Sequence, residues 1–296
     1  MSIGVTMFTQ VLISGLVLGC VYGLIALGYS LIYKASGMMS FMQGDLLTVG
    51  AFLGYTFYGL LKIPFAISFV LVFAVMFCLG LLVERGVIRI LVRKKVLPIY
   101  TVLATIAISY ILQNGSMFIW GSNMLTFPRI FKVDSIKILG VGVQPEAVLC
   151  IGVSFVAMII IHVFMKYTKF GTAMRAAAMD PMAARSCGIN VSLSTGMTWG
   201  IAAALASLAG MLLGPIYGVF TTLGATIGRK GFASAVMGGY GNMYGAIVGG
   251  ILLGLLETFT TGYISSAYKD LFAYIVLLLF LFIKPTGIFN ERAIAE

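Results

Sequence analysis

The sequence predicts an all-α membrane protein, and three observations lead to this fold class. Hydrophobic residues make up 60% of the 296 residues, only 9% are charged, and the mean hydropathy is +1.08. A soluble domain carries about 25% charged residues, so this chain has too few polar groups to cover a soluble core. Its apolar runs are too long for barrel strands, and an open sheet cannot satisfy its backbone in lipid. We therefore expect a single transmembrane domain over residues 1–296, a polytopic helix bundle.

The hydropathy pattern predicts 8 to 10 membrane spans, with nine as the preferred count. A spanning helix needs about 20 predominantly apolar residues. Two of the expected spans, 35–61 and 228–243, are rich in glycine or polar residues and are expected to be broken or re-entrant. The nine expected spans cover residues 8–33, 35–61, 64–84, 96–120, 145–167, 193–219, 228–243, 244–262 and 265–283.

The distribution of Lys and Arg predicts the orientation of the chain. Basic clusters at 85–95 and 166–185 are separated by two spans, and the segment between those spans, 121–144, is less basic. The positive-inside rule makes the side with the two clusters cytoplasmic, which puts the N-terminus outside and the C-terminus inside. The basic residues used here are Arg85, Arg89, Arg93, Lys94, Lys95, Arg129, Lys132, Lys137, Lys166, Lys169, Arg175, Arg185, Lys284 and Arg292.

The two halves of the chain have a similar layout. Residues 22–52 contain a span, a polar stretch punctuated by glycine and another apolar run, and residues 209–242 follow the same order. By the orientation above, the first span of the first half runs inward and that of the second half runs outward. This predicts an inverted-topology repeat, an arrangement typical of transporters.

A polar stretch in the first half is a candidate part of a translocation pathway. Gln43, Asp45 and Thr48 lie in an apolar neighbourhood, where a carboxylate is costly and usually faces a cavity or a partner. Gly44 indicates a break followed by a new helix start, at which an acid and a substrate carboxylate are both favoured. The alternative is that Asp45 only caps a helix near the surface.

The second half has a glycine-rich counterpart at 237–250, in which Gly239, Tyr240 and Asn242 are the candidate pathway residues. Glycines here either permit a broken helix with backbone dipoles near the bilayer midplane or serve close helix packing. Glu257, in the span that follows, is interpreted as the structural partner of a lysine or a backbone group, although a relay or a substrate contact stays possible.

The segment 168–192 is too long and too basic for a simple connection between two spans. Asp180 suits a helix N-cap, Pro181 the first helical position and Gly188 the helix end. Together with Arg175 and Arg185, these residues predict a helical element on the cytoplasmic surface that contacts another protein. A membrane subunit driven by a separate soluble subunit fits this pattern.

Several chemistries are excluded by what the sequence lacks. It has no G-x-x-x-x-G-K-[ST] loop for ATP. His162 is the single histidine, too few ligands for a metal site, and the four cysteines lack metal-binding or redox spacing and are expected to be unpaired. The net charge of +10 lies between apolar blocks, which indicates a membrane face and no nucleic acid. We expect no catalytic residues, no metal and no cofactor.

The order of YGLIALGYSLIYKASGMMSFMQGDLLTVGAF, FGTAMRAAAMDPMAARSCGINVS, VMGGYGNMYGAIVGGILLGLLE and KPTGIF resembles the permease subunits of high-affinity branched-chain amino-acid ABC importers. The likeness covers nearly the whole chain and implies a type II importer-like fold in an inner membrane. It also implies a heterodimer with a second permease, two cytoplasmic ATPase subunits and a periplasmic binding protein.

The family's usual aromatic-small-His-Gly turn is replaced by residues 41–44, FMQG, which leaves the solute open among branched-chain amino acids, other amino acids, urea and amides. The alternative from another class is an ion-coupled secondary transporter, and a channel is a third. Only Asp45 and Glu257 qualify as the membrane-embedded acids that ion coupling would need.

Overall fold

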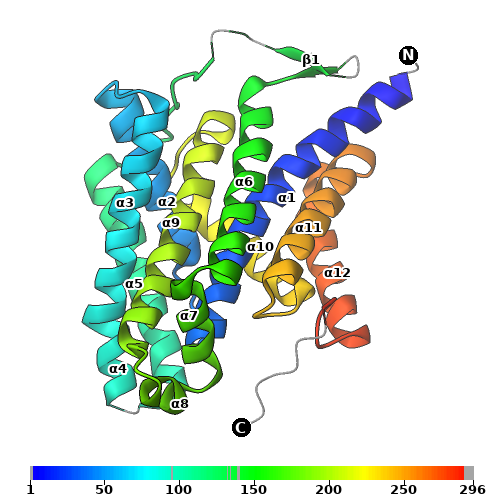
Figure 1. Cartoon of the computed structure of the whole chain (residues 1–296). Helices are drawn as coiled ribbons and strands as arrows, with labels where there is room; N and C mark the ends of the chain where they lie inside the picture. The colour runs from blue at the N-terminus through cyan, green and yellow to red at the C-terminus, as the bar shows by residue number, and fades with distance from the viewer. Residues whose placement is uncertain (1–2, 95, 132, 134, 139–140, 290–296) are drawn as a thin grey trace.

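The computed structural model describes residues 3–94, 96–131, 133, 135–138 and 141–289, which form a bundle of helices (Figure 1). Lys95, Lys132 and Arg292, used above to orient the chain, lie outside the described residues. The helices are α1 (Ile3–Ser36), α2 (Gln43–Gly54), α3 (Phe65–Val83), α4 (Arg89–Arg93), α5 (Pro98–Trp120), α6 (Pro145–Tyr167), α7 (Lys169–Met179), α8 (Pro181–Ser186), α9 (Val191–Tyr217), α10 (Leu223–Gly238), α11 (Met243–Tyr263) and α12 (Lys269–Ile283). Shorter elements are the π-helical turns η1 (Tyr55–Leu60) and η2 (Glu84–Ile88), the 3-10 turn η3 (Ser266–Tyr268), and the antiparallel strands β1 (Ile136–Ile138) and β2 (Val141–Val143).

Within the described residues, seven helical segments are long and apolar enough to cross a membrane. They match seven of the nine expected spans. Burial separates the centre of the bundle from its periphery, since 89% of the residues in an apolar 18-residue window of α9 are buried, against only 6% in the segment containing α12. The seven are Thr6–Ser36, Phe65–Arg93, Ile99–Trp120, Pro145–Tyr167, Val191–Tyr217, Met243–Tyr263 and Ser266–Ile283.

The two remaining expected spans are the short helices α2 and α10. The expected span 35–61 is divided. Residues 37–42 form a loop that starts at Gly37 with a φ of 65°, and the chain is helical again only from Gln43. The second is displaced, because α10 begins at Leu223 and ends at Gly238, before Gly239 takes a φ of 107° that is open to glycine and rare in other residues. The broken helices expected from the sequence are therefore present.

The packing of the long helices has the symmetry of an inverted repeat. Helix α1 runs antiparallel to α11, and α9 runs antiparallel to α3 in the same way. Helix α1, the first helix of the first half, also runs parallel to the short helix α10 of the second half. In the same way α9, the first helix of the second half, runs parallel to α2. The contacts that define these directions are Gly19–Ile251 and Gly23–Ile247, Gly200–Phe77 and Gly196–Leu81, Ile25–Gly231 and Tyr29–Phe232, and Gly50–Ser207 and Gly54–Met211.

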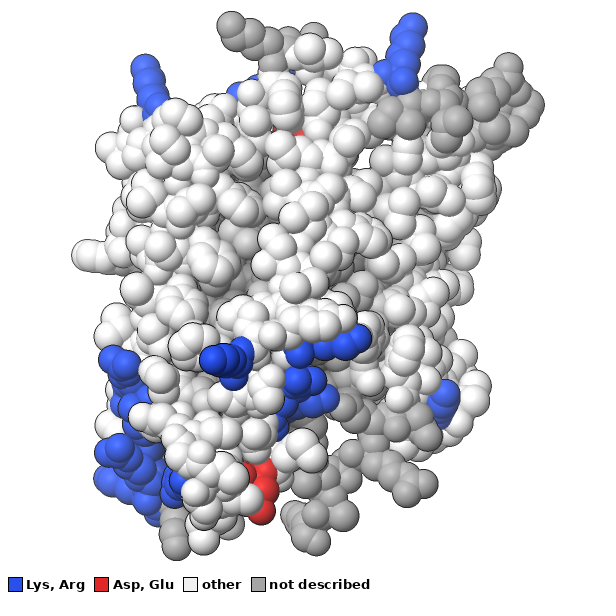
Figure 2. All heavy atoms as spheres, viewed as in Figure 1, with Lys and Arg blue, Asp and Glu red and all other residues white. Residues whose placement is uncertain are grey.

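Charge divides the surface into bands. On the face drawn in Figure 2, Lys and Arg gather around one end of the bundle, a few lie at the opposite end, and a broad band between them shows no charged atoms. Helices α4, α7 and α8 all lie at the basic end (Figure 1). The two basic clusters of the sequence thus lie at one end of the bundle, as expected. The four cysteines are free, as also expected.

Candidate functional site

The N-terminal ends of α2 and α10 meet inside the bundle. Gly44 and Gly224 bring the two backbones so close that a Cβ atom at Gly224 would overlap the carbonyl oxygen of Gly44. The backbone N–H of Gly224 donates a hydrogen bond to Thr48 Oγ1 at 2.8 Å, which holds the crossing together. Because a helix carries partial positive charge at its N-terminus, the crossing brings two positive ends to one place.

A cavity of about 720 Å³ opens beside this crossing, between α5, α10 and α12. Its wall contains two charged side chains, Asp45 and Arg229, and two polar ones, Ser109 and Gln113. The rest of the wall is mainly apolar and aromatic, which is typical of ligand pockets. The aromatic rings belong to Tyr29, Phe41, Tyr110, Phe232 and Tyr274.

The carboxylate of Asp45 is directed toward α5. Asp45 is only 5% exposed, and its Oδ2 accepts a hydrogen bond from the Ser109 hydroxyl. Its Oδ1 is buried and has no hydrogen-bond partner in the described part of the chain. The position before the helix, Met42, makes no side-chain cap, and Asp45 bonds to α5 instead of the first backbone N–H groups. The capping alternative is therefore not what the structure contains.

Gln43 and Thr48 share the first turns of α2 with Asp45 but face other helices. The Gln43 amide nitrogen donates to the carbonyl oxygen of Ala202 in α9 at 2.7 Å, and its Oε1 is buried without a partner. Thr48 accepts from Gly224, as described above. Of these three candidate pathway residues, Asp45 alone lines the cavity.

The second group of candidate pathway residues lies in the turn between α10 and α11. Gly239 ends α10, and the Asn242 side chain caps α11 by accepting from the N–H groups of residues 244 and 245. The Tyr240 ring packs against Tyr33 at 4.7 Å and against Phe232 at 5.5 Å between centroids. Phe232 also lines the cavity, so it connects this turn to the wall. The six candidates thus form two groups and do not surround one cavity.

The segment between α6 and α9 forms two short helices where the sequence indicated one helical element. Asp180 Oδ1 accepts from the N–H groups of Met182 and Ala183, Pro181 is the first residue of α8, and Gly188 follows its end with a φ of 79°. These local features match the expectation. Helix α7, capped by Thr168, precedes them.

Sequence reasoning did not find the apolar character of this surface. Met179 is 83% exposed and Met182 is 75% exposed, on either side of the α7–α8 junction. Arg185 is exposed as well, whereas Arg175 is partly buried and donates to the carbonyl oxygen of Lys166 at 3.4 Å. Flexible methionine side chains beside a basic group suit a protein contact. The charged residues that identify this segment in the sequence do not show which of its apolar side chains are exposed.

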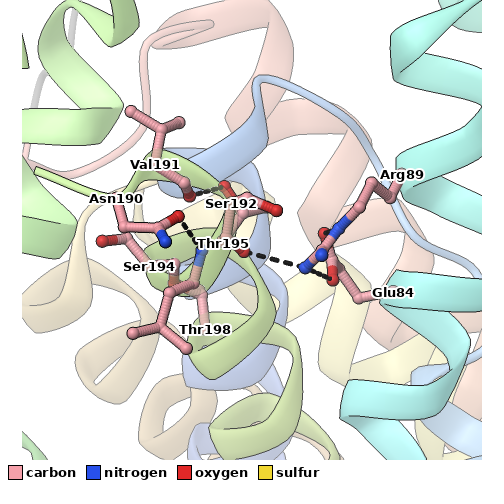
Figure 3. A network of polar contacts seen from close by, with 9 residues as sticks. Glu84, Arg89, Asn190, Val191, Ser192, Ser194, Thr195 and Thr198 are labelled. Atoms are coloured by element: carbon pink, nitrogen blue, oxygen red, sulfur yellow. Dashed lines mark hydrogen bonds and ion pairs between the residues drawn. The ribbon is translucent and has the colours of Figure 1, made fainter. Parts of the chain in front are cut away.

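A polar network fixes the start of α9, which follows this segment (Figure 3). The Arg89 guanidinium makes two hydrogen bonds to the Glu84 carboxylate, Nε to Oε1 at 3.1 Å and Nη2 to Oε2 at 2.5 Å. The same Nη2 donates to the carbonyl oxygen of Ser192 at 3.0 Å. The network ties η2 and α4 to the first turn of α9. The sequence analysis used Arg89 only as a basic residue that indicates the orientation of the chain. No local sequence pattern indicates its hydrogen bond to Ser192, which is 103 residues away.

A second polar cluster lies where α1, α10, α11 and α12 meet. Lys230 Nζ lies 2.5 Å from Glu257 Oε1 and 2.7 Å from Asp270 Oδ1, and the Tyr22 hydroxyl donates to Glu257 Oε2 at 2.7 Å. Glu257 is therefore the ion-pair partner of a lysine, which is one of the partners that the sequence analysis considered. The sequence did not identify Lys230 as that lysine.

The family model described as the permease component of the branched-chain amino acid transport system matches residues 11–281. The chain is 33% identical to the high-affinity branched-chain amino acid transport system permease protein LivH of Escherichia coli, over 98% of this chain and 97% of LivH. It is 32% identical to the corresponding protein BraD of Pseudomonas aeruginosa, over 98% of each. Among solved structures, PsaBC from Streptococcus pneumoniae in complex with Fab is similar with a TM-score of 0.50, covering 92% of this chain and 91% of that chain; at 15% identity this concerns the fold alone.

Proposed function

The chain belongs to the family of permease components of branched-chain amino acid transport systems, and from this premise we propose that it forms half of the translocation pathway of an ATP-binding cassette importer. The solute is a branched-chain or related amino acid, as the names of its relatives LivH and BraD suggest. The chain itself catalyses no reaction, and separate subunits hydrolyse ATP.

The observation that carries this proposal is the presence of Asp45 and Arg229 in one cavity. A free amino acid carries an ammonium group and a carboxylate. The unpartnered Oδ1 of Asp45 can accept from the ammonium group, and a guanidinium can bind a carboxylate through two parallel hydrogen bonds. The apolar wall then receives the solute's side chain.

A second, homologous permease subunit completes the pathway in this proposal. The cavity lies between α5 and α12, two of the least buried spans, and Arg229 is exposed beside it. A charged side chain that faces lipid at membrane depth is costly. A partner permease covering α5 and α12 would remove this cost and close the cavity into a channel for the solute.

The energy source in this proposal is a pair of cytoplasmic ATPase subunits that contact α7 and α8. The candidate residues of this contact segment are Arg175, Asp180, Pro181, Arg185 and Gly188. Its position at the basic end supports a cytoplasmic location by the positive-inside rule, with the N-terminus outside and the C-terminus inside an inner membrane. A periplasmic binding protein then delivers the solute to the opposite end.

The test is uptake of labelled leucine by vesicles that contain the assembled importer. Uptake should require ATP on the ATPase side and persist when ion gradients are collapsed. Asp45→Asn and Arg229→Gln should each lower uptake about tenfold or more, because each removes one charge-assisted contact, while Arg229→Lys keeps the charge and should lower uptake less. Uptake that needs no ATPase and stops with an ionophore would establish the secondary-transporter alternative.

Cysteine labelling checks the pathway independently of the solute. In a variant whose native cysteines are replaced by serine, Ser109→Cys should react with small polar thiol reagents, and the reaction rate should change with bound nucleotide. Thr48→Cys, whose position faces Gly224, serves as the control and should stay unreactive. A rate at Ser109→Cys that is the same in every nucleotide state would contradict a role in the moving pathway.

A further inference from the structure

A second cavity, of about 240 Å³, lies where α1, α6, α7 and α11 converge at the basic end of the bundle. Lys34 of α1, Lys166 of α6 and Arg175 of α7 contribute three cationic side chains to its wall, and His162 adds an imidazole. Asn242 and Tyr244 at the start of α11 also line it, and none of the described lining residues is acidic. So much positive charge in one small volume favours an anionic ligand.

The Arg175 guanidinium makes only long hydrogen bonds within the chain. Its Nη2 donates at 3.4 Å to the carbonyl oxygen of Lys166 and at 3.4 Å to Thr172 Oγ1, while its Nε is buried and has no partner in the described residues. The Tyr244 hydroxyl lies 3.4 Å from His162 Nε2. The N-terminus of α11, a helix of 21 residues, adds its partial positive charge at the same place.

We propose that this cavity binds the phosphate group of an anionic phospholipid. Arginine and lysine together suit a phosphate oxygen cluster, and basic pockets between transmembrane helices at the cytoplasmic side are suited to anionic lipid headgroups. The outer face of α6 leads to the cavity through Val156, Ile160 and Val163, which are 55%, 58% and 46% exposed. Acyl chains can lie along this apolar face while the phosphate reaches His162 and Lys166.

A bound headgroup would connect α7 to three spanning helices. Arg175 is the α7 residue in the cavity, and α7 leads directly into α8 through Asp180. The lipid would therefore hold the first helix of the 168–192 segment against α1, α6 and α11. This inference rests on the cavity and on the cytoplasmic orientation proposed above for the basic end, and it stands whether or not the chain transports amino acids.

The experiment measures lipid retention by native mass spectrometry on the purified assembly. Wild type should retain phosphatidylglycerol in preference to phosphatidylcholine. The double variant Lys166→Gln/Arg175→Gln should retain roughly 10- to 30-fold less phosphatidylglycerol, because it loses two basic side chains and each of them is expected to strengthen the binding of an anionic lipid by a similar factor. Arg93→Gln/Lys94→Gln removes the same charge from exposed positions at the same end and should retain as much as wild type.

Two further arms keep the inference open to disproof. Arg175→Lys preserves the charge and should restore most of the retention, which separates loss of the site from loss of folding; circular dichroism checks the helix content of every variant. Equal retention by the two double variants would overturn the proposal. Thermal stabilisation by inorganic phosphate but not by phosphatidylglycerol would assign the cavity to a free anion and overturn the lipid assignment.

Discussion

Lys230 and Glu257 form an ion pair inside the bundle, with Nζ 2.5 Å from Oε1 and each side chain only 4% exposed. Asp270 lies 2.7 Å from the same ammonium group but is itself 53% exposed. The pair joins the short helix α10 to α11. Because α10 also carries Gly224 and Arg229, this ion pair fixes the helix that forms one side of the cavity.

The first prediction concerns the buried pair. Glu257→Gln should lower the free energy of unfolding by about 3 kcal/mol, because it leaves a buried ammonium group without its main partner. Asp270→Asn is the matched control and should cost less than about 1 kcal/mol, since that partner is half exposed. Thermal unfolding of the purified protein in detergent measures both. An equal loss in the two variants would contradict the assignment of Glu257 as the main partner.

The pair also bears on the energy source. Glu257 is paired with Lys230, and we expect it to act as a structural group and not as an ion relay. The folded fraction of Glu257→Gln should therefore retain the wild-type dependence of uptake on pH and sodium. A shifted pH profile in this variant would favour a relay.

The second prediction concerns the crossing of α2 and α10. Gly224→Ala should destabilise the protein by roughly 1–3 kcal/mol, because the added methyl group overlaps the Gly44 carbonyl oxygen and the two helices must separate. Gly115→Ala in α5 places the same methyl group in open space and should be neutral or slightly stabilising. Unfolding temperatures in detergent compare the two, and a wild-type value for Gly224→Ala would contradict the close crossing.

Local chemistry explains what could be predicted from the sequence. Asp180, Pro181 and Gly188 determine α8 through hydrogen bonds and dihedral angles that span only a few residues, so their roles were readable in advance. The long apolar spans were readable for a similar reason, because hydropathy is a local sum. For Gly239, the sequence leaves a helix break and close helix packing as alternatives, and it places the start of α10 at residue 228 instead of Leu223.

Partner choice across the bundle explains what could not be predicted. Gln43 and Asp45 stand two residues apart, yet they bond to Ala202 and Ser109 on different helices, since successive residues of a helix face different directions. Lys230 and Glu257 are separated by 27 positions, and no local pattern pairs them. Arg229 became a candidate for the cavity only through the three-dimensional arrangement.

The third prediction concerns coupling between the membrane subunit and the proposed ATPase. Arg185 is exposed at the end of α8, near the exposed Met182, whereas Arg175 is turned toward α6. Arg185→Glu should therefore cut solute-stimulated ATP hydrolysis about tenfold, because the introduced carboxylate either repels an acidic group of the ATPase subunit or has no basic partner there. Membrane insertion and melting temperature should stay unchanged. Arg185→Lys, which keeps the positive charge at the same position, is the matched control and should leave hydrolysis unaltered. ATPase assays on the reconstituted complex distinguish the two, and cross-linking that finds residues 175–185 on the periplasmic side would refute both the orientation and the proposed contact.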